Sequence, residues 1–175
     1  MTIAIKLVDL ADARVQTAVV ELLDHYSQHE MGSNAPLTDD VKQRLIAGLR
    51  AHPMSRVFIA YHVAHESAAH DRAANVPEQP VGIAVCFVGF STFKAKPLIN
   101  IHDLAILQGY RGQGIGSQLI DAVTNYARSL GCSAVTLEVR ADNPARQLYH
   151  KKGFETLGEP LASDATLFGK LVLKN

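Results

Sequence analysis

Six residues between a predicted strand and a predicted helix have the types and spacing of an anion-binding loop. They are Arg111-Gly112-Gln113-Gly114-Ile115-Gly116. At a helix N-terminus several backbone N–H groups have no partner within the helix, and the helix dipole adds partial positive charge. Glycines let the backbone approach a phosphate closely, and an arginine adds a fixed charge. The loop predicts a pyrophosphate site; a tight strand–helix turn without a ligand is the alternative.

Single residues in this loop exclude two common phosphate-binding motifs. A dinucleotide fingerprint that begins at Gly112 requires a glycine where Ser117 stands. A nucleoside-triphosphate loop that runs from Gly109 to Gly114 requires a lysine where Ile115 stands. The pattern that the loop does match is Arg-x-x-Gly-x-Gly.

A second motif lies downstream of the loop. Asn143 is followed by Tyr149, and then by Gly153 and Phe154. Together with the glycine loop and the preceding strand at 101–106, this motif resembles the GNAT superfamily of acetyl-CoA-dependent N-acetyltransferases. The resemblance in motifs covers roughly residues 98 to 155, and the first half of the chain is similar only in the order of its elements.

The resemblance implies that acetyl-CoA is the co-substrate and that no metal is used. In the family two parallel strands splay apart, and unpaired strand groups bond the pantetheine amides in the gap. By resemblance, the strand residues hold pantetheine and the loop holds the pyrophosphate. The residues assigned to the cofactor are Leu104, Ala105, Ile106, Arg111, Gly112, Gln113, Gly114, Ile115, Gly116, Ser117 and Asn143.

Acetyl transfer to an amine requires loss of the amine's proton, stabilisation of an oxyanion and departure of a thiolate. Tyr149 stands at the position of the family's usual acid, which implies that it protonates the thiolate. A core tyrosine that packs the short helix is the alternative. Backbone N–H groups around 104–106 are candidate donors to the carbonyl oxygen. No cysteine occupies a motif position for an acyl-enzyme, so we expect direct attack.

The general base is sought on the strand at 98–106. Period-two alternation predicts two faces, with Asn100, His102 and Leu104 on one and Ile101, Asp103 and Ala105 on the other. Family members often carry a carboxylate at the position of Asn100 or His102, and asparagine cannot act as a base. His102 can, because an imidazole titrates at a pKa of about 6.5. A structural His102 bonded to the backbone is one alternative. A base at Asp103, at Glu138 on the adjacent strand, or acting through water is the other.

Hydrophobic periodicity predicts the elements that position these residues. We expect strands at 3–7, 57–63, 81–88, 98–106, 133–139, from 154 onward and at 165–173, and helices at 11–31, from the N-cap Thr38 to before Pro53, from the glycine loop to Gly131, and from an Asp142 or Asn143 cap to Gly153. The segment 62–80 is predicted to be a long hairpin loop. This order indicates one mixed α/β domain over residues 1–175. The resemblance implies a central twisted sheet of about seven strands with about four helices and a splayed strand pair that holds CoA.

Composition limits the classes of partner. The chain is 47% hydrophobic and carries 17 basic and 17 acidic residues, so it shows no charge excess suited to nucleic acid or anionic membrane. Its apolar runs are shorter than a membrane span, and its first residues do not resemble a secretory signal. Cys86 and Cys132 lie in apolar stretches and are predicted to be buried free thiols. We therefore expect a cytoplasmic protein.

The sequence favours an N-acetyltransferase that acts on a small-molecule or peptide amine. A non-catalytic CoA-binding sensor or interaction module is the alternative, because Asn100 takes the place of the usual carboxylate. Retention of Tyr149 and His102 favours the enzyme. A homodimer is the expected association, since dimers are common among similar proteins.

Overall fold

The computed structural model describes residues 1–64, 78–157, 162 and 164–173. Its strands are β1 (Thr2–Leu7), β2 (Ser55–Val63), β3 (Glu78–Ser91), β4 (Lys96–Ile106), β5 (Ala134–Arg140), β6 (Glu155–Leu157) and β7 (Thr166–Val172). Its helices are α1 (Ala13–Ser27), α2 (Asp39–Ala51), α3 (Ile115–Ser129) and α4 (Arg146–Lys151), with a 3-10 turn η1 at Gln108–Tyr110. The strands form one sheet in the order β1-β2-β3-β4-β5-β7-β6. The expected seven-stranded mixed sheet with four helices is confirmed.

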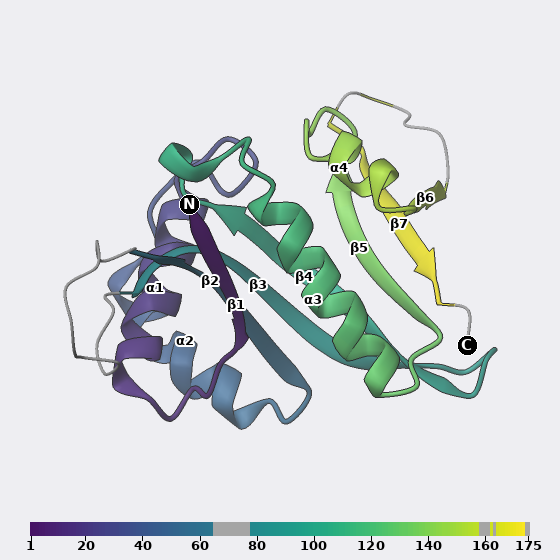
Figure 1. Ribbon diagram of the computed structural model, residues 1–175, viewed down its shortest axis with the longest axis horizontal. Helices are drawn as coiled ribbons and strands as arrows, with labels where there is room; N and C mark the ends of the chain where they lie inside the picture. Colours follow the sequence, from purple (N-terminus) through teal and green to yellow (C-terminus); the bar gives the residue numbers. More distant parts are fainter. Residues whose placement is uncertain (65–77, 158–161, 163, 174–175) are drawn as a thin grey trace.

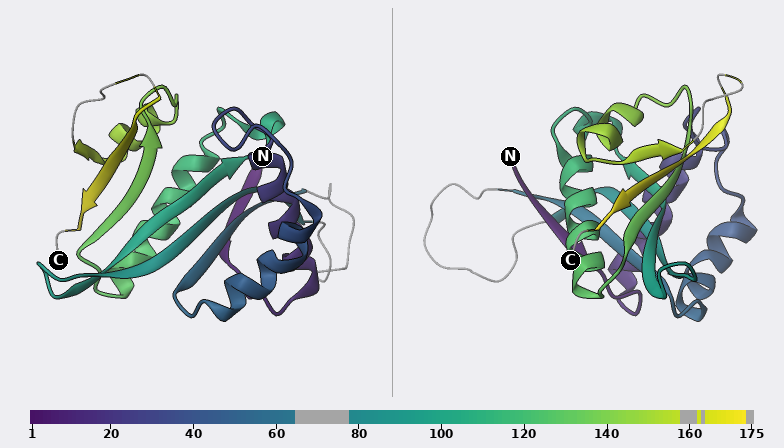
Figure 2. Two further views of the ribbon diagram at one scale, coloured as in Figure 1. Left: turned by 180° about the vertical axis from the view of Figure 1, so that it is seen from behind. Right: turned by 90° about the vertical axis from the view of Figure 1, so that its right-hand side faces the viewer.

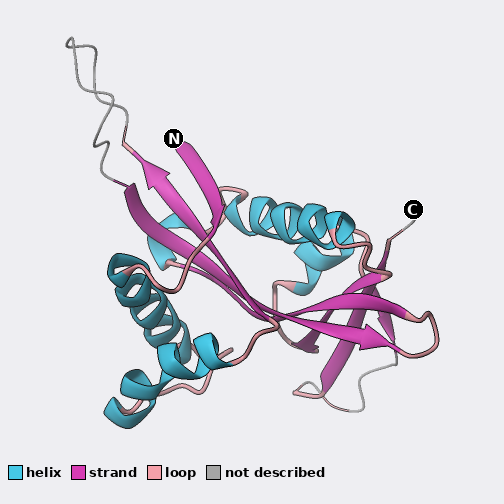
Figure 3. Cartoon of the chain, turned by 90° about the horizontal axis from the view of Figure 1, so that it is seen from below, coloured by secondary structure: helices cyan, strands magenta, loops and turns pink. Residues whose placement is uncertain are grey.

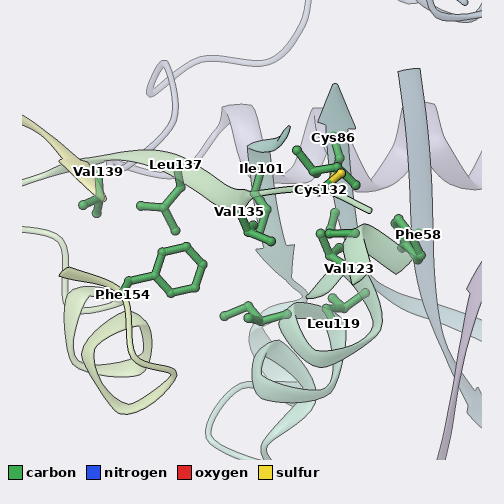
Figure 4. Close-up of a cluster of buried hydrophobic side chains, with 14 of the residues drawn as sticks. Phe58, Cys86, Ile101, Leu119, Val123, Cys132, Val135, Leu137, Val139 and Phe154 are labelled. Atoms are coloured by element: carbon green, nitrogen blue, oxygen red, sulfur yellow. The ribbon is translucent and has the colours of Figure 1, made fainter. Parts of the chain in front are cut away.

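Helices cover both faces of the sheet (Figures 2 and 3). On one face, Val19 and Leu22 of α1 belong to a buried cluster with Ile83 of β3. On the other face, α3 packs against β4 and β5. The cluster on that side contains Leu119, Val123, Val135, Leu137 and Phe154, which are labelled in Figure 4. Both apolar faces of the central strands are therefore buried, and the helix N-terminus after the glycine loop is held at the end of β4.

The predicted order of elements is confirmed, and the boundaries differ by a few residues. The first helix ends at Ser27, before the predicted 31, because the chain turns there. Thr38 caps α2, accepting a hydrogen bond from the Val41 N–H at 3.4 Å. Gly131 follows α3 with a positive φ of 70°. Within the predicted 62–80 loop, β2 continues to Val63 and β3 begins at Glu78, and residues 65–77 lie outside the described part of the chain.

The predicted cap of the short fourth helix was wrong. Helix α4 begins at Arg146, and its N-cap position is Ala145, which has no side-chain cap. Asn143 instead closes a turn before the helix, with its Oδ1 accepting the Ala145 N–H at 2.9 Å. The Asp142 carboxylate is paired with Arg140 at 2.6 Å. Asn143 and Asp142 therefore lie two and three residues before the N-cap position, and their side chains make other contacts.

The predicted alternation along β4 was also wrong beyond Ile101. Val85 pairs with Asp103 and Cys86 pairs with Ile101, so β4 has one residue more than β3 at His102. Such a bulge shifts the side-chain alternation by one residue. Asp103 thus lies with His102 on the α1 side, and Leu104 packs into the core on the α3 side. A strictly alternating strand would have placed Asp103 and His102 on opposite faces.

Strands β4 and β5 are parallel and separate towards their C-terminal ends. Their register comprises only Ile99 with Val135, Asn100 with Thr136 and Ile101 with Leu137. Beyond these pairs the two strands diverge into a V whose open end lies near α4 and the start of α3 (Figure 1). The splay confirms the expected strand arrangement and exposes backbone groups of both strands within the gap.

Both cysteines are buried free thiols, as predicted. Within the described ranges, none of the helices combines the length and the apolar character that crossing a bilayer would require.

Candidate active site

The loop before α3 has the backbone shape that its glycines allow. Gly112 and Gly114 have φ angles of 75° and 79°, a region that other residues rarely adopt. A Cβ built at either position would meet nothing within 4 Å, so space above the loop is open. At Gly116 a Cβ would lie 3.0 Å from the Leu148 side chain, which makes this glycine a packing contact between α3 and α4. The loop is thus both open to a ligand and fixed against α4.

The first turn of α3 presents unpaired donors at this loop. Gly114 occupies the N-cap position and provides no side-chain hydrogen bond. The first backbone hydrogen bond of α3 is donated by the Gln118 N–H to the Gly114 carbonyl at 3.1 Å. The N–H groups of Ile115, Gly116 and Ser117 come earlier and have no acceptor among the described residues. Oriented N–H groups of this kind fit a diphosphate.

Arg111 adds a guanidinium at the same place. Its Nε donates to the Ile106 carbonyl at 3.0 Å, and its Nη1 lies 3.0 Å from His29 Nε2. The His29 Nδ1 already accepts the Met31 N–H at 3.2 Å, so the other nitrogen of a neutral ring carries the proton and cannot accept from arginine. The contact with His29 is therefore weak, and Arg111 keeps donors available for an anion.

The backbone of β4 directs further groups into the gap, of which the Ile106 carbonyl already accepts the Arg111 Nε–H at 3.0 Å. The Leu107 N–H donates to the Val81 carbonyl at 2.9 Å, on the β3 side. Because groups alternate along an antiparallel ladder, Leu104 and Ile106 direct their N–H and C=O to the β5 side. The backbone pairing of β4 with β5 ends before these residues, at Ile101. These two residues occupy the positions predicted for amide contacts.

A cavity of about 220 Å³, here named the β4–β5 cavity, lies in the gap. The predicted site residues that line it are His102, Leu104, Ala105, Ile106, Arg111, Gly116, Asn143 and Tyr149. Gly112, Gln113, Gly114, Ile115 and Ser117 are outside the lining. They form the loop and the first helical turn beside Arg111 and Gly116, and the Ile115 side chain is buried in the core.

Three further lining residues come from the end of α1 and the chain that follows it. They are Tyr26, His29 and Met31. The sequence did not predict these three as cofactor-site residues, because the approach of this helix end to β4 depends on tertiary packing. The Arg140 Nη1 also donates to the Glu30 carbonyl at 3.4 Å, so this segment contacts both splayed strands.

Tyr149 is half-buried on α4, and its ring lies 5.9 Å from that of Phe154. Burial raises the pKa of its hydroxyl above the ordinary value, and the nearby Tyr26 adds to the rise. No described residue shares a hydrogen bond with the hydroxyl. At neutral pH the group therefore keeps its proton, which it can donate into the β4–β5 cavity.

His102 is exposed at the bulge of β4, where its ring meets the edge of Phe87 at 5.5 Å. No described residue forms a hydrogen bond with the imidazole. The alternative of a structural histidine bonded to the backbone thus finds no partner in the described part of the chain. An imidazole that is accessible and uncommitted can accept a proton.

The two carboxylates that were alternative bases lie on either side of His102. Glu138 lines the β4–β5 cavity and accepts a hydrogen bond from the Asn100 amide at 3.0 Å. Asp103 lines a neighbouring cavity of about 450 Å³, here named the α1–α2 cavity. Burial raises the pKa of Asp103, and the nearby charge of His102 opposes the rise. His102 is the candidate base that borders both cavities.

A family model described as the acetyltransferase (GNAT) family matches residues 23–154. This stretch includes the end of α1, the bulged strand, the glycine loop and Tyr149.

Curated relatives carry acetyltransferase names. A thialysine N-epsilon-acetyltransferase of Bos taurus is 37% identical over 90 residues, which cover 50% of this chain and 52% of that protein. An N-alpha-acetyltransferase, RimI, of Mycobacterium tuberculosis is 34% identical over 80 residues, which cover 44% of this chain and 49% of that protein. The matched stretches thus span about half the length of these relatives.

Solved structures show the same fold at low sequence identity. A chain of the NatC complex bound to Gag peptide and CoA superposes with a TM-score of 0.69 at 21% identity, covering 99% of this chain and all of that one, 100%. An aminoglycoside acetyltransferase from an uncultured soil metagenomic sample, in complex with sisomicin, gives a TM-score of 0.66 at 19% identity, covering 91% of this chain and 92% of that one.

Proposed function

Because the chain belongs to the acetyltransferase (GNAT) family, we propose that it is an acetyl-CoA-dependent N-acetyltransferase that acetylates a primary amine by direct attack. The observation that carries this proposal is one gap between β4 and β5 where donors for a diphosphate, free strand amides and the uncommitted Tyr149 hydroxyl meet. A fold shared by many activities would not suffice by itself. The chemistry of the residues around the gap is what favours acetyl transfer.

In this proposal the cofactor is held by the backbone more than by side chains. The loop N–H groups at 112–117 and the Arg111 guanidinium bind the diphosphate. The backbone of Leu104 to Ile106 bonds the pantetheine amides, and Asn143 holds the turn beside α4. Bound acetyl-CoA supplies the activated acetyl thioester. No metal enters the proposal.

The catalytic roles fall to His102 and Tyr149. His102 accepts the proton of the incoming ammonium group, so that the nitrogen can attack. The bond between nitrogen and the acetyl carbon forms first and gives a tetrahedral oxyanion, and the carbon–sulfur bond breaks when this intermediate collapses. Backbone N–H groups of β4 near Leu104 stabilise the negative charge on the carbonyl oxygen. Tyr149 donates its proton to the departing thiolate, and its phenolate regains a proton from the nitrogen, which loses its second proton as the amide forms. Water relaying the proton to Glu138 or Asp103 is the alternative route.

The ligands of two similar structures support the proposed class of acceptor. The similar structures contain a peptide in one case and an aminoglycoside in the other. For this chain we propose a small-molecule or peptide amine. A single domain, a homodimer and a cytoplasmic location stay predictions.

Two measurements on the purified protein test the function. Calorimetry is expected to detect binding of CoA and acetyl-CoA, and no binding of either would refute the cofactor site. Release of CoA thiol is then measured with a panel of amino acids, monoamines, polyamines, aminoglycosides and peptides. Turnover of at least one amine supports the enzyme. Binding without turnover of any amine supports the alternative, a CoA-binding sensor.

A further inference from the structure

The α1–α2 cavity adjoins the β4–β5 cavity. The two cavities share Tyr26, Met31 and His102 as lining residues. With a volume of about 450 Å³, the α1–α2 cavity is large enough for a small organic molecule. An amine bound there would reach His102 from the side opposite the glycine loop.

Most of the wall of this cavity is apolar. Leu23 comes from α1, Leu37 from the segment before α2, and Val41 and Leu45 from α2. A carbon skeleton placed against these side chains loses contact with water, which favours binding in proportion to the apolar area buried. The wall therefore suits an acceptor with an apolar body.

The neutral polar groups of the lining are used by the chain itself. The Ser27 hydroxyl donates to the Asp24 carbonyl at 2.8 Å, and the Tyr26 hydroxyl donates to the Met31 carbonyl at 3.2 Å. The Ser33 hydroxyl lies 3.2 Å from the Ser27 carbonyl and donates to it. A hydroxyl has one proton to donate, so none of these groups offers a free donor to a ligand carboxylate.

Among the described residues of the lining, one carboxylate has no hydrogen-bond partner. Asp103 makes no hydrogen bond or ion pair with any described residue, although it is partly buried. Beside His102, whose charge lies near Asp103, the described lining contains no other basic side chain and no second acidic one. A partly buried carboxylate attracts a cation strongly, because water screens it poorly. Among the described lining residues, Asp103 is therefore the one acidic group that could hold a ligand cation, and His102 is the one basic group.

We propose that the α1–α2 cavity selects a primary monoamine with a compact apolar body, an arylalkyl or branched alkyl amine, and that Asp103 holds its ammonium group next to His102. The inference rests on the proposed acetyl transfer. A free α-amino acid is disfavoured because its carboxylate, on the same carbon as the ammonium group, would lie close to the Asp103 carboxylate, and like charges repel. A diamine is disfavoured because its second charge would meet the apolar wall.

Matched pairs of amines test the selectivity of the full chain at saturating acetyl-CoA, with CoA thiol release as the readout. Phenethylamine and isopentylamine are compared with phenylalanine and leucine, which differ from them by one carboxylate. Hexylamine is compared with hexamethylenediamine, which adds one charge. We expect kcat/KM to be roughly 100-fold higher for each monoamine than for its amino acid, and roughly tenfold higher than for the diamine.

Two variants test the residues. Asp103→Asn keeps the shape and removes the charge, so KM for phenethylamine is expected to rise roughly tenfold while the Kd of CoA stays within about twofold. Leu45→Gln is expected to reduce the preference for phenethylamine over ethylamine. Asp121→Asn, on the exposed side of α3 where Asp121 pairs with Lys152, is the matched control and is expected to leave both values unchanged.

The outcomes separate this inference from the function on which it rests. Faster turnover of an amino acid, a diamine, a polyamine or a tripeptide than of the monoamines overturns the inference and leaves acetyl transfer intact. An unchanged KM for the amine in Asp103→Asn would show that Asp103 does not bind the ammonium group. Binding of CoA without turnover of any amine refutes the acetyl transfer, and the inference with it.

Discussion

Tyr149 combines a raised pKa with a hydroxyl that has no hydrogen-bond partner in the described part of the chain. Burial keeps the proton on this group at neutral pH, which is the state that a proton donor requires. We expect Tyr149→Phe to lower kcat roughly 100-fold with KM for acetyl-CoA nearly unchanged, because phenylalanine keeps the packing against Phe154. Steady-state rates from about pH 6 to about pH 9 provide the measurement. Full activity at every pH would make Tyr149 a packing residue only.

We expect the Asp103 carboxylate to lower the stability of the fold while it helps to bind the amine. Burial raises its pKa above the ordinary 3.8, with the charge of His102 acting against the rise. Below pH 3.8 the carboxyl is neutral in both the folded and unfolded chain, so it carries no ionisation penalty. As pH rises through that value towards the folded pKa, the unfolded chain ionises first and the folded state loses stability.

Asp103→Asn is therefore expected to raise the urea midpoint of unfolding at neutral pH, while it weakens amine binding. The gain should shrink as pH falls towards 3.8 and vanish below it. Urea titrations at constant ionic strength across this range measure the effect, with Asp121→Asn as the exposed control. A variant less stable than the parent at neutral pH would indicate that Asp103 already has a stabilising partner.

Residue types and spacing predicted much of this site. Arg111 and Gly114 could be predicted as anion-site residues, because such a site requires a positive charge and a left-handed backbone just before the start of a helix. Tyr26 and His29 were not predicted as cofactor-site residues, since their approach to Arg111 depends on how the end of α1 crosses the sheet. A contact between residues so distant in sequence leaves no local pattern.

At the scale of elements, β4 shows why the period-two alternation of side chains did not predict which face each residue occupies. Alternation predicted strand type correctly, but the bulge at His102 adds one residue against β3. Asp103 therefore joins His102 on the side of the α1–α2 cavity instead of facing α3. Bulges depend on pairing with the neighbouring strand, and the sequence of one strand does not reveal them.

Helices α1 and α2 shape that cavity through one carboxylate. Asp24 accepts the Leu37 N–H at 2.8 Å and pairs with Lys42 at 3.0 Å, so it ties α1 both to the connecting segment and to α2. The hydrogen bond from Lys42 is the main reason that the pKa of Asp24 lies below its ordinary value. The position of Leu37, and with it the apolar wall, depends on these contacts.

Asp24→Asn is expected to destabilise the fold by about 1 kcal/mol, because the pair is partly exposed to solvent. A lowered pKa means that the stabilisation is present above the ordinary 3.8 and is lost as pH falls through the folded value, so the deficit should disappear in acid. KM for the amine should rise while CoA binding stays unchanged. Urea titrations and kinetics measure both. Weaker CoA binding with unchanged KM for the amine would contradict this assignment of the α1–α2 wall.

At the scale of the whole molecule, the sheet consists of two parts joined by a short seam. Strands β1 to β4 form one part, and β5, β7 and β6 form the other. The backbone ladder between β4 and β5 has only three residue pairs, and α3 packs across the junction on one face. Local periodicity predicted each strand but gave no strand order, because order depends on which edges meet after folding. The resemblance of the motifs provided the expected splay.

This seam predicts how CoA should affect the molecule as a whole. A ligand that contacts the glycine loop, Leu104 on β4 and Asn143 beyond β5 links both parts of the sheet, so its binding energy should protect strands that it does not touch. At about 100 times its Kd, CoA is expected to stabilise the fold by about 2.7 kcal/mol. Hydrogen exchange followed by mass spectrometry should show slower exchange in β7 as well as in the loop at 111–117. ATP and NAD serve as controls, because they supply phosphates without a pantetheine arm to fill the gap. Protection confined to the loop would mean that CoA contacts only the part of the molecule that contains the loop, and that β4 and β5 do not form one binding site together.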